Sequence, residues 1–186
     1  MNNKYDVIVI GAGAAGLMCS IEAGKRGKSV CLLEHTSKIA EKIRISGGGR
    51  CNFTNLYSDD NNFLSENIHF CKSAFSKYTQ LDFINLVKKH SIELHEKKLG
   101  QLFCNKSAKD IIEMLIYECE KQKVKIKIET KINTLNKAKD CYVIKTNAGD
   151  LFSTSIVIAT GGKTIPKIGA TDFGYKVAKK FNLKVT

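Results

Sequence analysis

The sequence predicts an α/β protein with a Rossmann-like nucleotide-binding fold, in which helices lie on the faces of a parallel central sheet. Three observations predict it. Glycines in a Gly-x-Gly-x-x-Gly pattern at 11–16 directly follow a short apolar run at 5–10. A helical pattern then leads to a second apolar run at 29–33, and the apolar period changes to two after residue 124. With 186 residues, 43% of them hydrophobic, the chain is expected to form one domain over 1–186.

The first elements form a predicted βαβ unit with the glycines at its first turn. Residues 5–10 are expected to be a buried strand, because the run is apolar, short and followed by glycines. A helix is expected next, since Leu17, Ile21 and Ala23 share one stripe, and it should end at Arg26-Gly27. Residues 29–33 are the second predicted strand, which leads into Glu34.

The middle of the chain is expected to be a helical excursion over about 60–120. Residues 46–55 before it are predicted to form no regular element, because three successive glycines lose too much backbone entropy inside a helix or strand. Capping boxes at Thr79 and Ser107 predict two helices. The first includes the apolar residues Leu81, Ile84 and Val87, and the second should bury Ile111, Ile112, Leu115, Ile116 and Cys119.

A β meander is predicted over about 124–158. Val124, Ile126 and Ile128 alternate with charged residues, and residues 147–150 have the composition of a turn. The last predicted strand, at 155–159, ends in Thr160-Gly161-Gly162.

The glycine motif predicts dinucleotide binding. Its first glycine permits a tight turn, its second lets a pyrophosphate approach the backbone, and its third lets helix and strand pack closely. The helix that follows presents free N–H groups to the phosphates. Glu34 comes 18 residues after the last glycine, where a carboxylate can accept ribose hydroxyls. A surface carboxylate at a strand end is the alternative interpretation of Glu34.

These residues leave FAD and NAD(P) both open, although an acidic strand end argues against the extra phosphate of NADP. Residues 47–50, Gly-Gly-Gly-Arg, can present N–H groups and a guanidinium to anionic or polar atoms, unless they form a flexible surface loop. A simple NAD domain normally needs neither the meander nor the second glycine turn at Gly161-Gly162, which favours FAD.

Composition suggests a cytoplasmic protein without a signal peptide, membrane span or metal site. Nowhere do about 18 uncharged apolar residues follow one another. The seven cysteines are odd in number and never form CxxC, which suits free thiols in a reducing compartment. The four histidines form no ligand or triad pattern.

The net charge of +12 raises the possibility of a nucleic-acid partner. Only three of the 30 basic residues are arginines, however, whereas a selected phosphate-binding face would be expected to use bidentate arginine. Residues 1–100 carry a net charge of +4 and residues 101–186 a net charge of +8. We therefore expect a small-molecule substrate, no nucleic-acid partner and no membrane.

Three stretches carry a resemblance to a known family. They are EKIRI followed by SGGGRCNFTN at 41–55, GQLFC at 100–104, and ATGGKTIPKIGATDFGY at 159–175. The sequence resembles the bacterial NAD(P)/FAD-dependent oxidoreductases, whose members include aminoacetone oxidase and bile-acid-type reductases. The family is distantly similar to the flavoprotein subunits of succinate dehydrogenase and fumarate reductase. The resemblance covers essentially the whole chain and implies that residues 1–186 are an FAD-binding domain.

The resemblance implies a set of cofactor-binding residues. The pyrophosphate would lie against the first glycine turn, the adenosine ribose against the end of the second strand, and the flavin side against the later loops. The implied residues are Gly11, Ala12, Gly13, Ala14, Ala15, Gly16, Glu34, His35, Lys42, Ser46, Gly47, Gly48, Gly49, Arg50, Cys51, Asn52, Ile132 (through its backbone), Ala159, Thr160, Gly161, Gly162, Asp172, Phe173 and Gly174.

The implied activity is hydride transfer between a small organic substrate and FAD, with NAD(P)H or oxygen as a possible redox partner. No catalytic acid or base is identified, and Cys51 is expected to be a packed thiol rather than a redox participant. Because family members continue into a further domain and a C-terminal segment, the chain is expected to be truncated. The alternatives are a non-catalytic or degenerate dinucleotide-binding fragment and an RNA-associated flavoprotein, which the charge alone supports.

Overall fold

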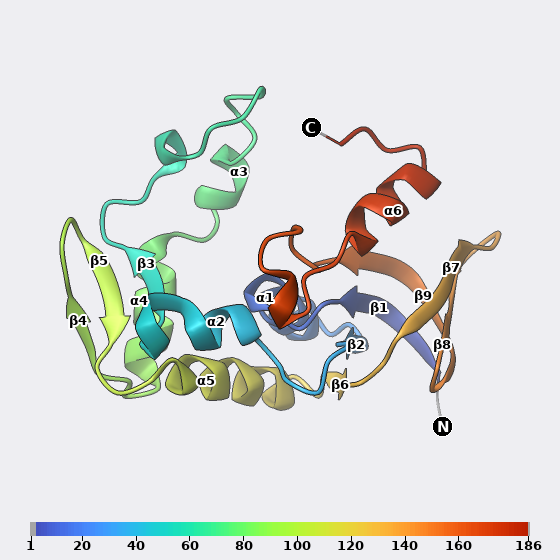
Figure 1. Cartoon of the computed structure of the whole chain (residues 1–186), viewed down its shortest axis with the longest axis horizontal. Coiled ribbons are helices and arrows are strands. Elements are labelled where there is room, and N and C mark those ends of the chain that lie inside the picture. The colour runs from blue at the N-terminus through green and yellow to red at the C-terminus, as the bar shows by residue number, and fades with distance from the viewer. Residues whose placement is uncertain (1–2, 186) are drawn as a thin grey trace. The chain divides into compact units, whose positions relative to one another are not determined.

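The structure is a computed structural model that describes residues 3–185, and it divides into two compact units (Figure 1). The first unit comprises Met1–Lys42 and Leu115–Thr186, and the second comprises Ile43–Met114. The first unit is thus built from two separate stretches of the chain, which the second unit interrupts.

The first unit contains a six-stranded sheet in the order β6-β2-β1-β9-β8-β7. Its strands are β1 (Lys4–Ile10), β2 (Val30–Leu33), β6 (Lys125–Lys127), β7 (Ile132–Lys137), β8 (Tyr142–Thr146) and β9 (Gly149–Ile158). Strand β1 pairs in parallel with β2 and β9, and β2 pairs in parallel with β6. The predicted parallel central sheet and its first βαβ unit are confirmed.

Strand β6 corrects one part of the prediction, because it does not belong to the meander. It pairs in parallel with β2, with Cys31 opposite Lys125 and Leu33 opposite Lys127. The antiparallel meander consists of β7, β8 and β9 alone. Apolar alternation at 124–128 indicates a strand but says nothing about its partner. Here α5 (Ala108–Lys121) precedes β6 and returns the chain in the direction of β2.

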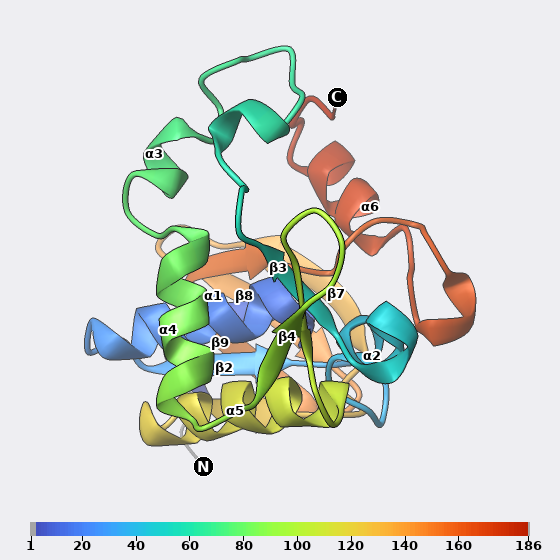
Figure 2. The same ribbon diagram turned by 90° about the vertical axis from the view of Figure 1, so that its left-hand side faces the viewer.

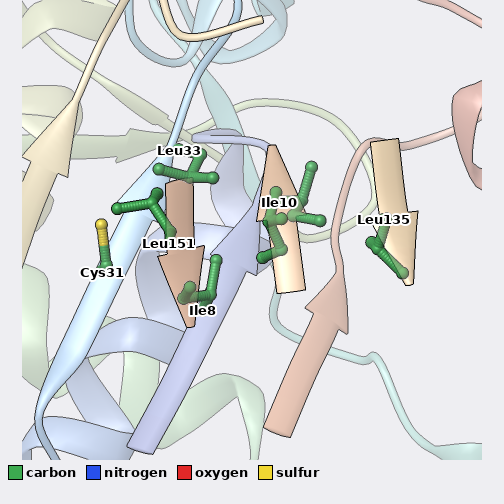
Figure 3. Close-up of a cluster of buried hydrophobic side chains, with 7 residues drawn as sticks. Ile8, Ile10, Cys31, Leu33, Leu135 and Leu151 are labelled. Atoms are coloured by element: carbon green, nitrogen blue, oxygen red, sulfur yellow. The ribbon is translucent and has the colours of Figure 1, made fainter. Parts of the chain in front are cut away.

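The two faces of the parallel sheet are covered differently. On one face, the side chains of Ile8, Ile10, Cys31 and Leu33 form a buried cluster with Leu135, Ile144 and Leu151 of the meander (Figure 3). On the other face, α1 (Ala14–Lys25) packs against β1 and β2, with Leu17 and Ile21 fully buried. The alternation of strand side chains explains this division, because Val9 and Leu32 point away from the cluster and are also fully buried.

The second unit mixes helices with a three-stranded antiparallel sheet in the order β3-β5-β4. The strands are β3 (Asn52–Asn55), β4 (Leu94–Glu96) and β5 (Gln101–Cys104), and they appear with α3 and α4 in Figure 2. The helical segments are α2 (Glu41–Ile45), which begins in the first unit, the 3₁₀ turns η1 (Ser46–Gly49) and η2 (Asp60–Asn62), α3 (Lys72–Phe75), α4 (Gln80–Lys89) and the first half of α5.

Two predictions for this region were wrong. Residues 60–120 are not a purely helical excursion, because β4 and β5 lie within them. Residues 46–55 are not wholly irregular, because Asn52–Asn55 form β3 against β5. Pairing with the apolar strand Gln101–Cys104 decides this conformation, and a distant partner cannot be recognised from the local glycine content.

Both predicted helix starts are present. At α4, the Thr79 hydroxyl accepts a hydrogen bond from the Asp82 N–H, and the Asp82 carboxylate accepts one from the Thr79 N–H at 2.7 Å. At α5, half of the predicted capping box is present, because the Asp110 carboxylate accepts from the Ser107 N–H at 3.4 Å, while the Ser107 hydroxyl accepts from the Lys109 N–H. The predicted buried face of α5 is largely correct, although Ile116 is only half-buried and Met114 is buried in addition.

The last elements of the first unit are the turn η3 (Pro166–Ile168) and α6 (Phe173–Lys180). Phe173 and Phe181 pack against the buried cluster beneath the meander. Within residues 3–185, no helix has both the length and the apolar character needed to cross a membrane.

Candidate functional site

The glycine turn joins β1 to α1 at the carboxyl end of the parallel strands, and two of its glycines are required by the protein's own packing. Gly11 has a φ of +104°, and a Cβ placed on it would lie 2.6 Å from the Ala159 carbonyl oxygen. A Cβ on Gly16 would overlap the carbonyl oxygen of Gly11. These two positions therefore hold the turn tightly between the end of β9 and the first turn of α1.

Gly13 differs from both, because no protein atom lies within 4 Å of a Cβ placed there. Its φ of −83° is open to any residue, so the fold itself gives no reason for a glycine at this position. Gly13 is also the N-cap of α1, which has no side-chain cap and no acidic residue in its first turn. Open space thus lies beside a helix end whose N–H groups and partial positive charge suit an anion.

Glu34 follows β2 directly and is almost fully buried, with 8% of its surface exposed. One carboxylate oxygen accepts a hydrogen bond from the Ala12 N–H at 3.0 Å. The other accepts from the Thr36 N–H and hydroxyl, both at 2.9 Å, and lies 3.0 Å from His35 Nδ1. Because a carboxylate can accept about four hydrogen bonds, the oxygen that faces Ala12 retains capacity for a hydroxyl donor.

The backbone before β7 lies beside Glu34. The Thr130 N–H donates to the Glu34 carbonyl at 2.8 Å, and the Glu129 N–H donates to the Thr36 carbonyl at 3.0 Å. Ile132 begins β7, and its half-buried side chain packs against the hydrophobic cluster. Since that side chain faces the core, the backbone is the part of this segment that remains for a ligand.

The end of β9 continues the same edge of the sheet. The Ala159 N–H donates to the Ile10 carbonyl at 2.8 Å, which places Ala159–Gly162 next to the glycine turn. Within the described part of the chain, the buried Thr160 hydroxyl has no hydrogen-bond partner. A buried polar atom without a partner is costly, and the Ser153 hydroxyl is the other such side-chain atom among the described residues.

Two further candidate regions lie close to this loop. Lys42 Nζ donates to the Thr164 hydroxyl at 3.1 Å, just after the Gly161-Gly162 pair. At the start of α6, a Cβ on Gly174 would lie 3.1 Å from the Thr160 hydroxyl oxygen. Asp172 occupies the N-cap position of α6 without a side-chain cap hydrogen bond, and it pairs with Lys176 at 3.0 Å, which lowers the pKa of the Asp172 carboxyl.

The loop Ser46–Asn52 belongs to the second unit. Gly47, Gly48 and Gly49 all have positive φ, and Gly48 and Gly49 have open space beside them. Successive amides in this conformation suit an anionic or polar atom. Cys51, by contrast, is buried, and burial raises the pKa of its thiol. Its side chain is therefore a neutral packed thiol.

The first unit brings the glycine turn, the Glu34–His35 pair, Lys42, the start of β7, the Ala159–Gly162 loop and the Asp172–Gly174 turn to one edge of its sheet. The predicted residues Ser46–Asn52 lie in the other unit.

Sequence reasoning missed Thr36, which fixes the Glu34 carboxylate. A threonine two residues after a strand-end carboxylate is a local signal for such a contact. Among residues 3–185, no group of three or more His, Cys, Asp or Glu is placed to hold a metal ion.

Both the sequence and the fold of the chain have relatives among known proteins. The profile of a family described as "HI0933-like protein Rossmann domain" matches residues 5–186. A protein from Escherichia coli named "Ribosomal RNA dihydrouridine synthase" is 48% identical over 182 residues, which are 98% of this chain and 46% of that protein. A protein of the same name from Haemophilus influenzae is 44% identical over 189 residues, covering all of this chain and 47% of that protein.

A more distant relative is "3-dehydro-bile acid delta(4,6)-reductase" from Clostridium scindens, which is 27% identical over 92% of this chain and 42% of that protein. The chain thus spans about half the length of the curated relatives that it matches. The resemblance to bile-acid-type reductases is supported, whereas none of these three relatives is named an aminoacetone oxidase.

Solved structures share the fold at low sequence identity. THI4 from Thermovibrio ammonificans has a TM-score of 0.60 at 14% identity, over 98% of this chain and 65% of that chain. The halogenase PltM, solved with phloroglucinol and FAD, has a TM-score of 0.55 at 17% identity, over 98% of this chain and 37% of that chain. The predicted Rossmann-like fold of FAD-binding proteins is confirmed.

The expectation of a small-molecule substrate and no nucleic-acid partner is contradicted by the two relatives named for ribosomal RNA. The argument from the scarcity of arginine was wrong for a physical reason. Lysine neutralises phosphates and releases counterions as arginine does, so a basic chain rich in lysine is fully able to bind RNA. Arginine is distinguished by its bidentate geometry, not by its charge.

Proposed function

The chain belongs to the family of HI0933-like proteins with a Rossmann domain, and from that premise we propose that it is the FAD-binding part of a flavoprotein that reduces uridine in ribosomal RNA to dihydrouridine. One observation carries the substrate: the 48% identity, over 98% of this chain, to the E. coli protein named for that product. Because the chain spans about half of that relative, the proposal concerns the activity of the longer protein to which this sequence corresponds.

The residues of the first unit fit FAD. The open space at Gly13 and the uncapped start of α1 suit the pyrophosphate. Glu34 lies one strand away, held in place by Ala12 and Thr36, with capacity to accept a hydroxyl of the adenosine ribose. The unpartnered Thr160 hydroxyl offers a hydrogen bond further along the same edge.

Formation of dihydrouridine adds a hydride and a proton across the 5,6 double bond of uracil. FAD, once reduced, supplies the hydride. The role of this chain is to bind and orient: the backbone at Gly13 positions the pyrophosphate, and the carboxylate of Glu34 fixes the adenosine end. NAD(P)H is the proposed source of the electrons. A cytoplasmic location, expected from cysteines that are all free thiols, agrees with a ribosomal substrate.

Two measurements test the proposal. In the first, the purified chain is incubated with FAD and desalted, and its visible absorption spectrum is recorded beside that of Gly13→Ala. We expect the wild-type chain to retain flavin and the variant to retain less at equal protein concentration, because the added methyl group fills the open space. A folded wild-type chain that emerges colourless contradicts the cofactor assignment.

In the second, the longer gene is expressed in an E. coli strain that lacks the 48%-identical relative. The dihydrouridine content of the ribosomal RNA is then measured by mass spectrometry. We expect the wild-type gene to restore the modification and Gly13→Ala to restore less at equal expression. A soluble, flavin-loaded protein that restores none contradicts the substrate while leaving the cofactor assignment intact.

A further inference from the structure

Positive charge is unevenly divided between the two units. The first unit carries 20 basic and 10 acidic residues, whereas the second carries 10 and 8. Nearly all of the net charge of +12 therefore lies on the unit that contains the glycine turn. A polyanion that binds this chain is attracted mainly to the first unit.

Helix α6 combines exposed positive charge with an exposed aromatic ring, and it begins beside the candidate cofactor loop. Its apolar side is occupied, because Phe173 and Phe181 pack against the buried cluster. Tyr175 and Lys179, one turn apart, lie on the opposite side of the helix and are both exposed. Lys163 adds a second cation, with Nζ 5.1 Å from the centre of the Tyr175 ring. We call Lys163, Tyr175, Lys176 and Lys179 the α6 strip.

The α6 strip begins beside the candidate cofactor loop. A Cβ on Gly162 would lie 3.6 Å from the Tyr175 hydroxyl, and one on Gly174 would lie 3.1 Å from the unpartnered Thr160 hydroxyl. A base stacked on Tyr175 would therefore lie next to the residues that we assign to the cofactor. The other end of the helix is fixed to the sheet, because Lys180 Nζ donates to the Leu135 carbonyl at 2.6 Å and to Asn136 Oδ1 at 2.7 Å.

We propose that the α6 strip binds single-stranded RNA beside the flavin site, with one base stacked on Tyr175 and phosphates contacting Lys163 and Lys179. This inference rests on the proposed function, since it takes RNA to be the substrate. Sequence-tolerant binding of single strands combines a basic surface with aromatic rings on which bases stack. Lys176 contributes less to the net charge of the strip, because Asp172 pairs with it at 3.0 Å.

An ordinary solvated helix face would also expose lysines, but the position of the tyrosine distinguishes the two interpretations. Tyr175 is 42% exposed on the side of α6 that makes no core contact, and a cation already lies over its ring. Helix α5 also exposes a tyrosine one turn from a lysine, at Tyr117 and Lys121, so the distinguishing feature of Tyr175 is its place beside Gly162 of the candidate cofactor loop. An RNA-stacking surface requires the ring and not its hydroxyl.

The test uses the 186-residue chain and a fluorescein-labelled single-stranded RNA of roughly 12 nucleotides, within the usual site size for one small domain. Binding is followed by fluorescence anisotropy over a series of salt concentrations. The variants are Tyr175→Ala, Tyr175→Phe, Lys179→Gln and, as a matched charge control, Lys88→Gln. Lys88 is an exposed lysine in the last turn of α4 in the second unit. Circular dichroism and urea unfolding establish that each variant is folded.

We expect Tyr175→Ala to weaken binding by at least about fivefold, the low end of the loss for one stacked base. Tyr175→Phe should bind as the wild type does. Lys179→Gln should lower the slope of log affinity against log salt by about 0.7, the value for one phosphate contact on a single strand. Lys88→Gln should leave both affinity and slope unchanged.

If the wild type binds the RNA and neither Tyr175→Ala nor Lys179→Gln changes that binding, the α6 strip is overturned while the proposed function stands. Equal losses in Tyr175→Ala and Tyr175→Phe also overturn the stacking role, because they assign the effect to the hydroxyl. If the wild type binds no RNA even at low salt, the strip is overturned, and the restoration of dihydrouridine in cells decides the proposed function separately.

Discussion

Gly11 and Gly13 of the first turn should respond differently to substitution by alanine, because only Gly11 is required by the packing of the protein. Alanine at Gly11 meets the Ala159 carbonyl oxygen 2.6 Å from its Cβ and must also adopt a φ of +104°. Alanine at Gly13 meets nothing within 4 Å and keeps an ordinary backbone conformation. We therefore predict that Gly11→Ala damages the fold and that Gly13→Ala damages only the binding of the cofactor.

The magnitudes follow from these contacts. At Gly11, the unfavourable φ costs roughly 1–2 kcal/mol and overpacking adds about 1–3 kcal/mol, so unfolding should become easier by roughly 2–5 kcal/mol. At Gly13, alanine gains about 0.4–1 kcal/mol from the reduced entropy of the unfolded chain. It loses a similar amount as a poorer N-cap than glycine. The net change in stability at Gly13 should therefore lie within about 0.5 kcal/mol of zero.

Urea unfolding followed by circular dichroism measures the stability term, and titration of FAD followed by quenching of flavin fluorescence measures the cofactor term. Gly13→Ala should unfold as the wild type does and bind FAD at least about tenfold more weakly, a loss of about 1.4 kcal/mol. The reasoning is refuted if Gly13→Ala binds FAD with wild-type affinity, or if it is destabilised as much as Gly11→Ala.

Three further predictions concern stability. Glu34→Gln should destabilise the chain by about 1–3 kcal/mol in urea unfolding, because an amide oxygen that accepts from the Ala12 N–H leaves the NH₂ group facing the donors of Thr36. Unchanged stability would contradict the hydrogen bonds from Ala12 and Thr36 to the Glu34 carboxylate. Burial raises the pKa of Cys104 to about 12, above about 8.5 in the unfolded chain. The stability that this neutral thiol contributes is therefore complete below about pH 8.5 and declines up to about pH 12, by at most ~1.4 kcal/mol per pH unit. The unfolding free energy lost in Cys104→Ala should therefore be smaller at pH 10.5 than at pH 7, and an equal loss at both would argue against a buried neutral thiol. Thr79→Ala should cost about 1 kcal/mol through loss of the α4 cap, whereas Ser76→Ala, outside that cap, should cost measurably less.

The sequence alone predicts those helices and strands whose ends carry a local signal. The run β1, glycine turn, α1 and β2 was predicted because each boundary carries its own signal, such as the glycines after Ile10 and Arg26-Gly27 after the helix. The Thr79 cap was predicted for the same reason. At the site, the positions of the glycines and of Glu34 follow directly from this βαβ unit.

The elements that were mispredicted depend on partners distant in sequence. Strand β6 was assigned to the meander, because its alternation does not reveal that its partner is β2 across a helical crossover. Strand β3 was predicted to be part of a loop, because its partner β5 (Gln101–Cys104) is distant from Asn52–Asn55 in sequence. The contact between Thr36 and Glu34 is the exception, because it is local in sequence and was missed although a threonine two residues after a strand-end carboxylate indicates it.

The mistaken exclusion of RNA shows why charge has to be counted by folded unit. Division of the sequence at residue 100 gives net charges of +4 and +8, which look like a broadly basic chain. The second unit interrupts the first along the chain. Counted by unit, the first carries 20 basic and 10 acidic residues and the second carries 10 and 8. The strongly basic unit is the one that carries the glycine turn and α6. Because screening by salt acts on local charge density, the salt dependence of RNA binding should follow substitutions in the first unit and be nearly insensitive to those in the second.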